Sequence, residues 1–232
     1  MGGDRVHYDI SGGRTAISVL ILALVLAFYL FANSPFFETD HVEWTGLVYL
    51  DSKQLDAFLD FATVNVWRLD TKELETVLLE HPWVNRARVV WRWPNRVIVS
   101  VEERTPIAQV STVAGWFLLD GEGNLLPPAQ GGLVLPLPIV TNLDLGSVEQ
   151  VVSTARLVTM IPPALKPIIS EWNVLTRSFI SRSGTEILMG PPADLEEKFL
   201  LLEKIMDDLA SRQEHAGKID LRVPKNPVVS IL

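Results

Sequence analysis

The sequence has no cysteine among its 232 residues. Disulfide bonds, thiolate zinc sites and a cysteine nucleophile are therefore excluded. Basic residues are also in the minority, because 20 lysines and arginines stand against 28 aspartates and glutamates, which gives a net charge of −8. Proteins bind nucleic acid through clusters of lysine and arginine on the phosphates, so this balance argues against nucleic acid as a partner.

Residue patterns typical of catalysis or metal binding are missing as well. The four histidines are scattered, without the spacing of a metal-binding pair. Residues 120–124 (DGEGN) resemble the start of a calcium loop, but Leu125 stands where such a loop needs glycine and Gly131 where it needs glutamate. A plain hairpin turn is the better interpretation. We expect no catalytic residues, no metal, no cofactor and no small-molecule substrate.

Residues 16–32 form one long apolar run, and no charge lies between Arg14 and Glu38. At about 1.5 Å per residue, a helix of this length covers roughly 26 Å, which is near the roughly 30 Å core of a bilayer. Residues up to 34 extend the run into the interface. We expect residues 1–15 to be a cytoplasmic head and residues 16–34 a transmembrane segment in the lipid bilayer.

A cleaved signal peptide is the alternative for this segment. Its apolar region spans about 7–15 residues and ends at small side chains, whereas this run is longer and ends in Leu30-Phe31-Ala32. We therefore predict an uncleaved signal anchor. Arg5 and Arg14 lie in the head and an acidic flank follows the run, so the positive-inside rule favours a single-pass type II protein with its later domains outside the cytoplasm.

Residues 37–104 have the periodicity of a small α+β domain. Residues 37–46 favour a strand. Apolar residues then recur at helical spacing after Ser52, an expected N-cap, and after Asp70, which forms a capping-box pattern with Glu73. We expect two helices on one face of a three-stranded sheet.

Two β-rich runs, residues 87–93 and 96–102, complete that sheet as a hairpin. Arg86, Arg88 and Arg92 alternate along the first strand, so they share one face. A solvated face is the simpler interpretation. The alternative is a docking surface for acidic partner segments or lipid head groups, to which Arg96 also belongs. Five of the seven tryptophans lie in this domain; we expect most in the core and one or two at a lipid interface.

Four elements of this region resemble a POTRA domain, in the order and spacing of the FtsQ/DivIB cell-division proteins. They are Asn65–Asp70 (NVWRLD), His81–Val89 (HPWVNRARV), Trp93-Pro94-Asn95 and Val101–Ala108 (VEERTPIA). The resemblance extends over nearly the whole chain. It implies a POTRA domain over residues 35–105 and a β domain over residues 106–232.

The second domain is β-rich with two helices. Residues 115–128 predict strand, turn, strand, and both this hairpin and residues 136–141 resemble family elements. One helix is predicted over about 148–160, and another after Asp194, which forms a capping-box pattern with Glu197. Further strands are predicted over residues 168–175, 179–183, 185–189, 218–223 and 228–232. The expected fold class is α+β: one transmembrane helix, a POTRA domain and a mixed β-rich domain with flanking helices.

The resemblance implies a non-catalytic divisome scaffold at the bacterial division septum that binds FtsB- and FtsL-like proteins. In the family, the last strand of the β domain accepts a strand from FtsB. Residues 219–223 (IDLRV) resemble the family element "vDLRY": Asp220, Leu221 and Arg222 match, and Val223 stands where tyrosine is usual. From this resemblance we assign a partner-contact role to Arg222 and Val223. By position alone, we assign the same role to the final strand (Val228, Val229, Ser230 and Ile231).

Two alternatives stay open. In the first, the closing strands are internal and fully paired, with no free edge. In the second, the chain is a POTRA-containing protein of membrane-protein assembly or polypeptide transport. Such proteins usually carry several POTRA units or a large barrel, whereas only about 127 residues follow this POTRA unit.

Overall fold

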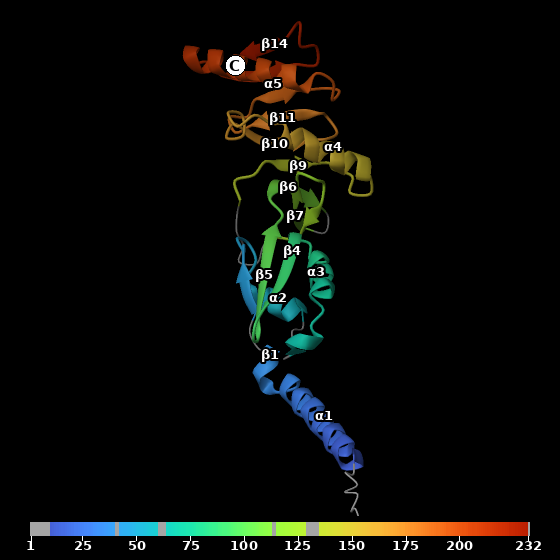
Figure 1. Ribbon diagram of the computed structural model, residues 1–232. Coiled ribbons are helices and arrows are strands. Elements are labelled where there is room, and N and C mark those ends of the chain that lie inside the picture. The colour runs from blue at the N-terminus through green and yellow to red at the C-terminus, as the bar shows by residue number, and fades with distance from the viewer. Residues whose placement is uncertain (1–9, 40–41, 60–63, 113–114, 129–134, 232) are drawn as a thin grey trace, which may run out of the picture. The chain divides into compact units, whose positions relative to one another are not determined.

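The computed structural model describes residues 10–39, 42–59, 64–112, 115–128 and 135–231 (Figure 1). The chain divides into two compact units. Unit 1 comprises residues 1–47, 51–80 and 86–102. Unit 2 comprises residues 48–50, 81–85 and 103–232.

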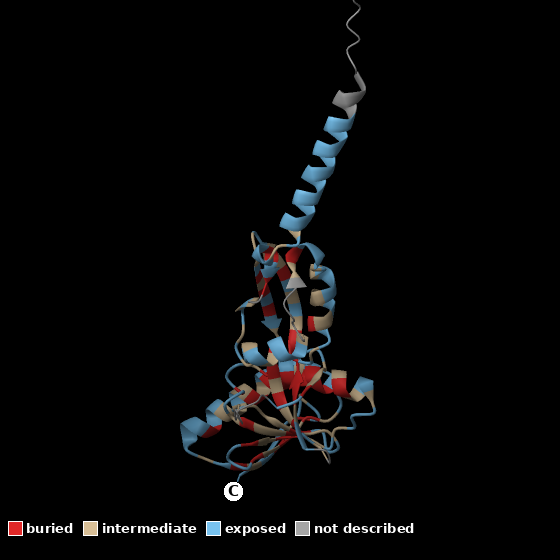
Figure 2. Cartoon of the chain, turned by 90° about the horizontal axis from the view of Figure 1, so that it is seen from below, coloured by how far each residue is buried: buried red, intermediate tan, exposed pale blue. Residues whose placement is uncertain are grey.

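Unit 1 begins with helix α1 (Ile10–Ala32), which starts six residues before the predicted span. Residues Thr15–Ala32 are long and apolar enough to cross a membrane, with a mean hydropathy of 2.6 and no buried residue. Figure 2 shows this helix exposed over residues 15–31, with intermediate burial at Ala32. A helix that is apolar all round, with no buried residue along its apolar span, fits a membrane anchor.

The rest of unit 1 has the predicted order of strands and helices. Its three-stranded sheet has the order β2-β5-β4, with β2 parallel to β5, and a separate pair joins β1 to β3. Helices α2 and α3 contribute buried Leu55 and Leu78, and the sheet contributes buried valines at 89, 97, 99 and 101. The bounds are β1 (Glu38–Thr39), β2 (Val42–Thr45), α2 (Ser52–Leu59), β3 (Val64–Asn65), α3 (Thr71–Leu79), β4 (Val84–Arg92) and β5 (Arg96–Glu103).

The helix caps follow the predictions in part. The Asp70 carboxylate accepts hydrogen bonds from the backbone N–H groups of Lys72 and Glu73, so the predicted N-cap of α3 is confirmed. The N-cap of α2 is Asp51, because its carboxylate accepts the N–H of Lys53 at 3.2 Å. The prediction of Ser52 as the cap was wrong by one residue, since serine and aspartate suit this position equally well.

Unit 2 is built on a nine-stranded sheet with the order β14-β13-β12-β11-β10-β9-β6-β7-β8. The pairs β6–β9, β9–β10 and β12–β13 are parallel, and the other neighbours are antiparallel. The bounds are β6 (Pro106–Thr112), β7 (Gly115–Asp120), β8 (Leu125–Leu126), β9 (Ile139–Thr141), β10 (Ile169–Asn173), β11 (Ser178–Ser181), β12 (Glu186–Leu188), β13 (Ala216–Asp220) and β14 (Val228–Ile231).

Two helices connect parallel neighbours of this sheet. Helix α4 (Val148–Thr159) links β9 to β10, and α5 (Leu195–Arg212) links β12 to β13. Each connection is a strand–helix–strand unit, which parallel strands require. The helices and strands bury one continuous core that includes Leu119, Ala155, Phe179, Leu202 and Ile219.

The start of α5 contradicts a prediction. Asp194 has a φ of 55° and its side chain makes no capping hydrogen bond, so the predicted capping box with Glu197 is wrong. The buried ammonium of Lys198 instead donates to the carbonyl oxygens of Met189 and Pro191 at 2.8 and 3.0 Å. Burial lowers the pKa of Lys198, while nearby Asp194 opposes that shift.

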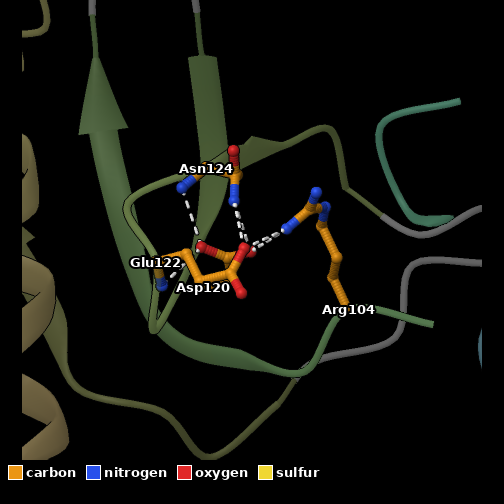
Figure 3. Close-up of polar contacts among 4 residues, drawn as sticks. All are labelled: Arg104, Asp120, Glu122 and Asn124. Atoms are coloured by element: carbon orange, nitrogen blue, oxygen red, sulfur yellow. Dashed lines mark hydrogen bonds and ion pairs between the residues drawn. The ribbon is translucent and has the colours of Figure 1, made fainter. Parts of the chain in front are cut away.

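The turn between β7 and β8 is the hairpin predicted at residues 120–124. One carboxylate organises it: Asp120 accepts the backbone N–H groups of Glu122 and Asn124, the side-chain amide of Asn124 and a guanidinium N–H of Arg104 (Figure 3). Four donors on one buried carboxylate account for the turn without a bound cation.

Short segments 48–50 and 81–85, which the predicted POTRA domain of residues 35–105 includes, belong to compact unit 2. The Glu103 carboxylate accepts the N–H groups of Val48, Tyr49 and Leu50 at 2.9, 2.7 and 3.1 Å. Buried Trp83 packs against Tyr49 with a centroid distance of 5.2 Å. The two domain ranges therefore stay a prediction, and the compact units cut the chain differently.

Candidate partner-binding strand edge

Strand β14 lies at one end of the nine-stranded sheet. It pairs with β13 in antiparallel register, with Ile219 opposite Val229 and Asp220 opposite Val228. Among the described residues no strand pairs with its other side. The alternative of a fully paired, internal final strand is not what the described sheet shows. An edge of this kind presents backbone N–H and C=O groups to another chain.

The side chains of β14 are apolar and exposed, which is unusual for an edge strand. Val228, Val229 and Ile231 are 55%, 36% and 55% exposed, and Ser230 is exposed between them. Edge strands are commonly blunted by lysine, proline or a bulge in the strand itself. Here Pro224 and Pro227 precede the strand, so they limit pairing only at its start.

Arg222 and Val223 lie in the segment between β13 and β14. The Arg222 guanidinium contacts the Asp220 carboxylate through Nε at 3.0 Å and Nη2 at 2.6 Å. Hydrogen bonds from Arg222 hold the pKa of Asp220 below its usual value. The Arg222 side chain is still 59% exposed, and Val223 is 61% exposed. Both residues are accessible to a partner, and the arginine is held in one orientation.

Asp220 matches the family element in the sequence, but the sequence analysis gave it no role at this site. It occupies the last position of β13, opposite Val228, and fixes the orientation of Arg222. The signal was present, since an aspartate two residues before an arginine places opposite charges within reach of each other. Gly190 also lies close, because a Cβ there would be 2.9 Å from Cγ of Arg222.

The arginines predicted on one face of the POTRA sheet belong to unit 1, whereas the β14 edge belongs to unit 2. Arg86, Arg88, Arg92 and Arg96 are all exposed. Arg86 pairs with Glu102 at 3.4 Å, and both side chains are more than half exposed. Such a pair contributes little to stability. The shared face is confirmed, and a docking role for it stays a prediction.

Comparisons with known proteins match nearly all of the two globular regions. The family described as "POTRA domain, FtsQ-type" matches residues 37–104. The family described as "Cell division protein FtsQ/DivIB, C-terminal" matches residues 108–222. The second match ends at residue 222, before β14 begins at Val228.

Curated relatives carry the same description. The chain is 30% identical over 197 residues to the cell division protein FtsQ of Myxococcus fulvus, covering 78% of this chain and 68% of that protein. It is 28% identical over 176 residues to FtsQ of an Anaeromyxobacter species, covering 68% and 58%. It is 23% identical over 217 residues to FtsQ of Chloroflexus aurantiacus, covering 88% and 79%. The chain belongs to the FtsQ/DivIB family of cell division proteins.

Proposed function

We propose that the protein is a non-catalytic, membrane-anchored divisome scaffold that binds FtsB- and FtsL-like proteins at the β14 edge and so helps to recruit and regulate septal cell-wall synthesis. The observation that supports it most is the position of β14 at the end of the sheet, with three exposed apolar side chains. Family membership supports the cell-division role.

The physical basis is strand addition. An extended segment laid against β14 forms main-chain hydrogen bonds that give affinity, and alternate side chains meet Val228, Val229 and Ile231, which gives selectivity. The exposed guanidinium of Arg222 lies at the end of β13 beside this edge, held by Asp220. It suits an acidic group on the partner, because arginine binds carboxylates with two parallel hydrogen bonds.

Helix α1 supplies the anchor in this proposal. A helix with the length and composition of Thr15–Ala32 confines the two units to the extracytoplasmic surface of the cell membrane, where similarly anchored partners reach a high effective concentration. The rival reading, a POTRA protein of membrane-protein assembly or transport, has less support. Residues 108–222 match the FtsQ/DivIB C-terminal domain, which is the part of the chain a transport protein has no reason to share.

The test is binding of the full chain, in nanodiscs, to the extracytoplasmic segment of the host's FtsB-like protein. Proline at Val229 and proline at Ser230 are compared, because neighbouring residues of a strand point their N–H groups to opposite sides. One of these substitutions removes a backbone N–H donor from the open edge of β14, and the other removes a backbone N–H donor that faces β13. We expect both to weaken binding at least tenfold, and the open-edge variant to unfold as the natural protein does.

Leu175→Ser is the matched control, since Leu175 is 79% exposed on the turn between β10 and β11, outside the proposed edge. It should bind normally. If both proline variants bind the FtsB-like segment with unchanged affinity, the edge does not hold the partner and this proposal is wrong.

A further inference from the structure

Exposed aromatic side chains gather in unit 1 at the end of α1. Trp67 is 56% exposed and Trp93 is 67% exposed, whereas the other three tryptophans of the predicted POTRA domain are buried or partly buried. Phe36, which follows α1 by four residues, is 49% exposed. Indoles exposed to this extent are uncommon on a soluble surface, because each leaves a large apolar area in water.

Ring contacts connect these side chains to the helix. Phe37 is 1% exposed and lies between Phe31 of α1 and Trp67, with centroid distances of 5.1 and 5.6 Å. Phe36 contacts Trp93 with a centroid distance of 6.0 Å. Phe36 in turn contacts Phe37 with a centroid distance of 5.2 Å, so Trp67 and Trp93 are two and three ring contacts away from the last turn of α1.

Two polar contacts hold the same loop against the helix end. The side-chain amide of Asn65 donates to the carbonyl oxygen of Ala32 at 2.8 Å, and Nη2 of Arg68 donates to Oδ1 of Asn33 at 2.9 Å. Ala32 is the last residue of the apolar span. Trp67 lies between these two anchoring residues in the sequence, so its position relative to the end of the span is fixed by hydrogen bonds on both sides.

We infer that Trp67, Trp93 and Phe36 form an interfacial aromatic anchor that docks unit 1 on the bilayer surface. This rests on α1 being the membrane anchor proposed above. Apolar side chains of α1 cover the hydrocarbon depth, and the indoles lie just beyond its end, at the level where tryptophan is enriched in membrane proteins. An indole suits that level because its ring is apolar and its N–H reaches water or a head group.

Charge on the neighbouring residues is consistent with the same occupant. Arg92 and Arg96 flank Trp93 on the hairpin, and Arg68 follows Trp67; all three are exposed. Arginine near a membrane surface is attracted to anionic lipid head groups. A second protein is the competing occupant, but the continuity of the aromatic surface with an exposed, apolar α1 identifies the bilayer.

The aromatic anchor sets the orientation of unit 1 on the membrane. A single helix leaves the attached domain free to tilt, whereas two indoles at the interface add a second point of contact to the helix. Unit 1 is then held in one orientation on the membrane, and the outward face that carries Arg88 and Arg92 is presented at a fixed angle to the surface.

The test uses the full chain reconstituted in vesicles of phosphatidylcholine and phosphatidylglycerol that contain brominated acyl chains, which quench tryptophan fluorescence at the interface. The variant W67F/W93F keeps an aromatic ring at both positions, so the contacts to Phe36 and Phe37 are preserved. We expect the quenched part of the emission to fall by at least half in this variant.

W116F is the matched control, because Trp116 is 50% exposed on β7 in unit 2. We expect it to leave the quenched part of the emission unchanged. Equal quenching in the natural chain and W67F/W93F, or loss of quenching in W116F alone, would overturn the inference. Retention of the chain in the vesicles after an alkaline carbonate wash tests the α1 anchor separately, so failure of the anchor is distinguishable from failure of the aromatic docking.

Discussion

A guanidinium nitrogen of Arg104 lies 2.9 Å from the Asp120 carboxylate, across the start of β6 and the end of β7. The two side chains are only 19% and 5% exposed. Arg104 also donates its backbone N–H to the carbonyl oxygen of Trp83 at 2.8 Å. The pair therefore holds together the segments of unit 2 that come from the predicted POTRA domain and those of the β sheet.

Asp120→Ala should destabilise unit 2 by about 3 kcal/mol, because it removes the buried carboxylate from this pair and leaves Arg104 only the exposed carboxylate of Glu122. It also leaves the N–H groups of Glu122 and Asn124 without their acceptor. Urea unfolding of the full chain measures the loss. Glu122→Ala is the control: Glu122 pairs with Arg104 at 2.8 Å but is 69% exposed, so less than about 1 kcal/mol is expected. Equal effects in both variants would contradict this role of Asp120.

The same pair predicts a loss of stability in acid. Burial alone would raise the pKa of Asp120, but hydrogen bonds from Asn124, Arg104 and Glu122 outweigh it and lower the pKa below 3.8. Because the pKa of Asp120 is lower in the folded than in the unfolded chain, its ionised carboxylate contributes to the free energy of unfolding. That contribution is complete above the unfolded pKa and disappears as the pH falls through the lower folded pKa. The stability difference between the natural chain and Asp120→Asn should therefore be constant near neutrality and shrink below about pH 4. A difference that does not change with pH would contradict the lowered pKa.

Gly46→Ala should destabilise unit 1 by about 3 kcal/mol or more. Gly46 has a φ of +85°, and a Cβ there would lie 2.2 Å from the carbonyl oxygen of Val101, so a backbone segment must move. Gly184→Ala separates backbone strain from the steric contact, because Gly184 has a φ of +88° but no atom within 4 Å of a Cβ. Only the backbone strain of about 1 kcal/mol is expected there. Thermal unfolding by circular dichroism compares them, and similar losses would show that the contact with Val101 is unimportant.

The β4–β5 hairpin of unit 1 was predictable from local patterns, whereas β2 pairs with β5, and β1 with β3, between segments that are far apart in the sequence. Arginines alternating with apolar residues in β4 and the turn at Pro94-Asn95 define a hairpin by themselves. The exposure of Trp67 and Trp93 was not predictable in detail, since a tryptophan in a strand or turn has the same pattern in a core and at a membrane surface.

Unit 2 was predictable as a set of elements but not as a sheet. Strand β6 was missed as an element, although it pairs with both β7 and β9 inside the sheet. The position of β14 at the edge depends on the parallel pair β12–β13, which α5 joins across 27 residues between Leu188 and Ala216. Pairings over such separations have no local sequence signal. Arg222 and Val223 were assigned by resemblance and the residues of β14 by their position at the end of the domain, and the order of the sheet places β14 at its edge.

Arg222→Ala should weaken binding of an FtsB-like segment at least tenfold without a change in thermal unfolding. The reason is that the guanidinium is oriented by Asp220 but exposed, so its removal takes away donors for the partner and leaves no buried charge. Isothermal titration with the full chain in nanodiscs measures the affinity. Arg212→Ala is a matched control, because Arg212 is also 59% exposed and pairs with an aspartate, Asp208, at 2.8 Å. Equal loss of affinity in both would mean that only net charge matters.

Reversing Arg88 and Arg92 to glutamate should reduce enrichment at the division septum by at least half while leaving FtsB-like binding within twofold. These two side chains share the exposed face of the POTRA sheet, and their reversal replaces an attractive field for acidic partners or lipid head groups by a repulsive one. Fluorescence microscopy of a fusion at the N-terminal head gives the enrichment. The control reverses Lys204 and Arg212 on the exposed face of α5, which changes the net charge equally. If the POTRA pair and the α5 pair have the same effect, the arginine face is a solvated surface with no docking role, because charge alone then accounts for the result.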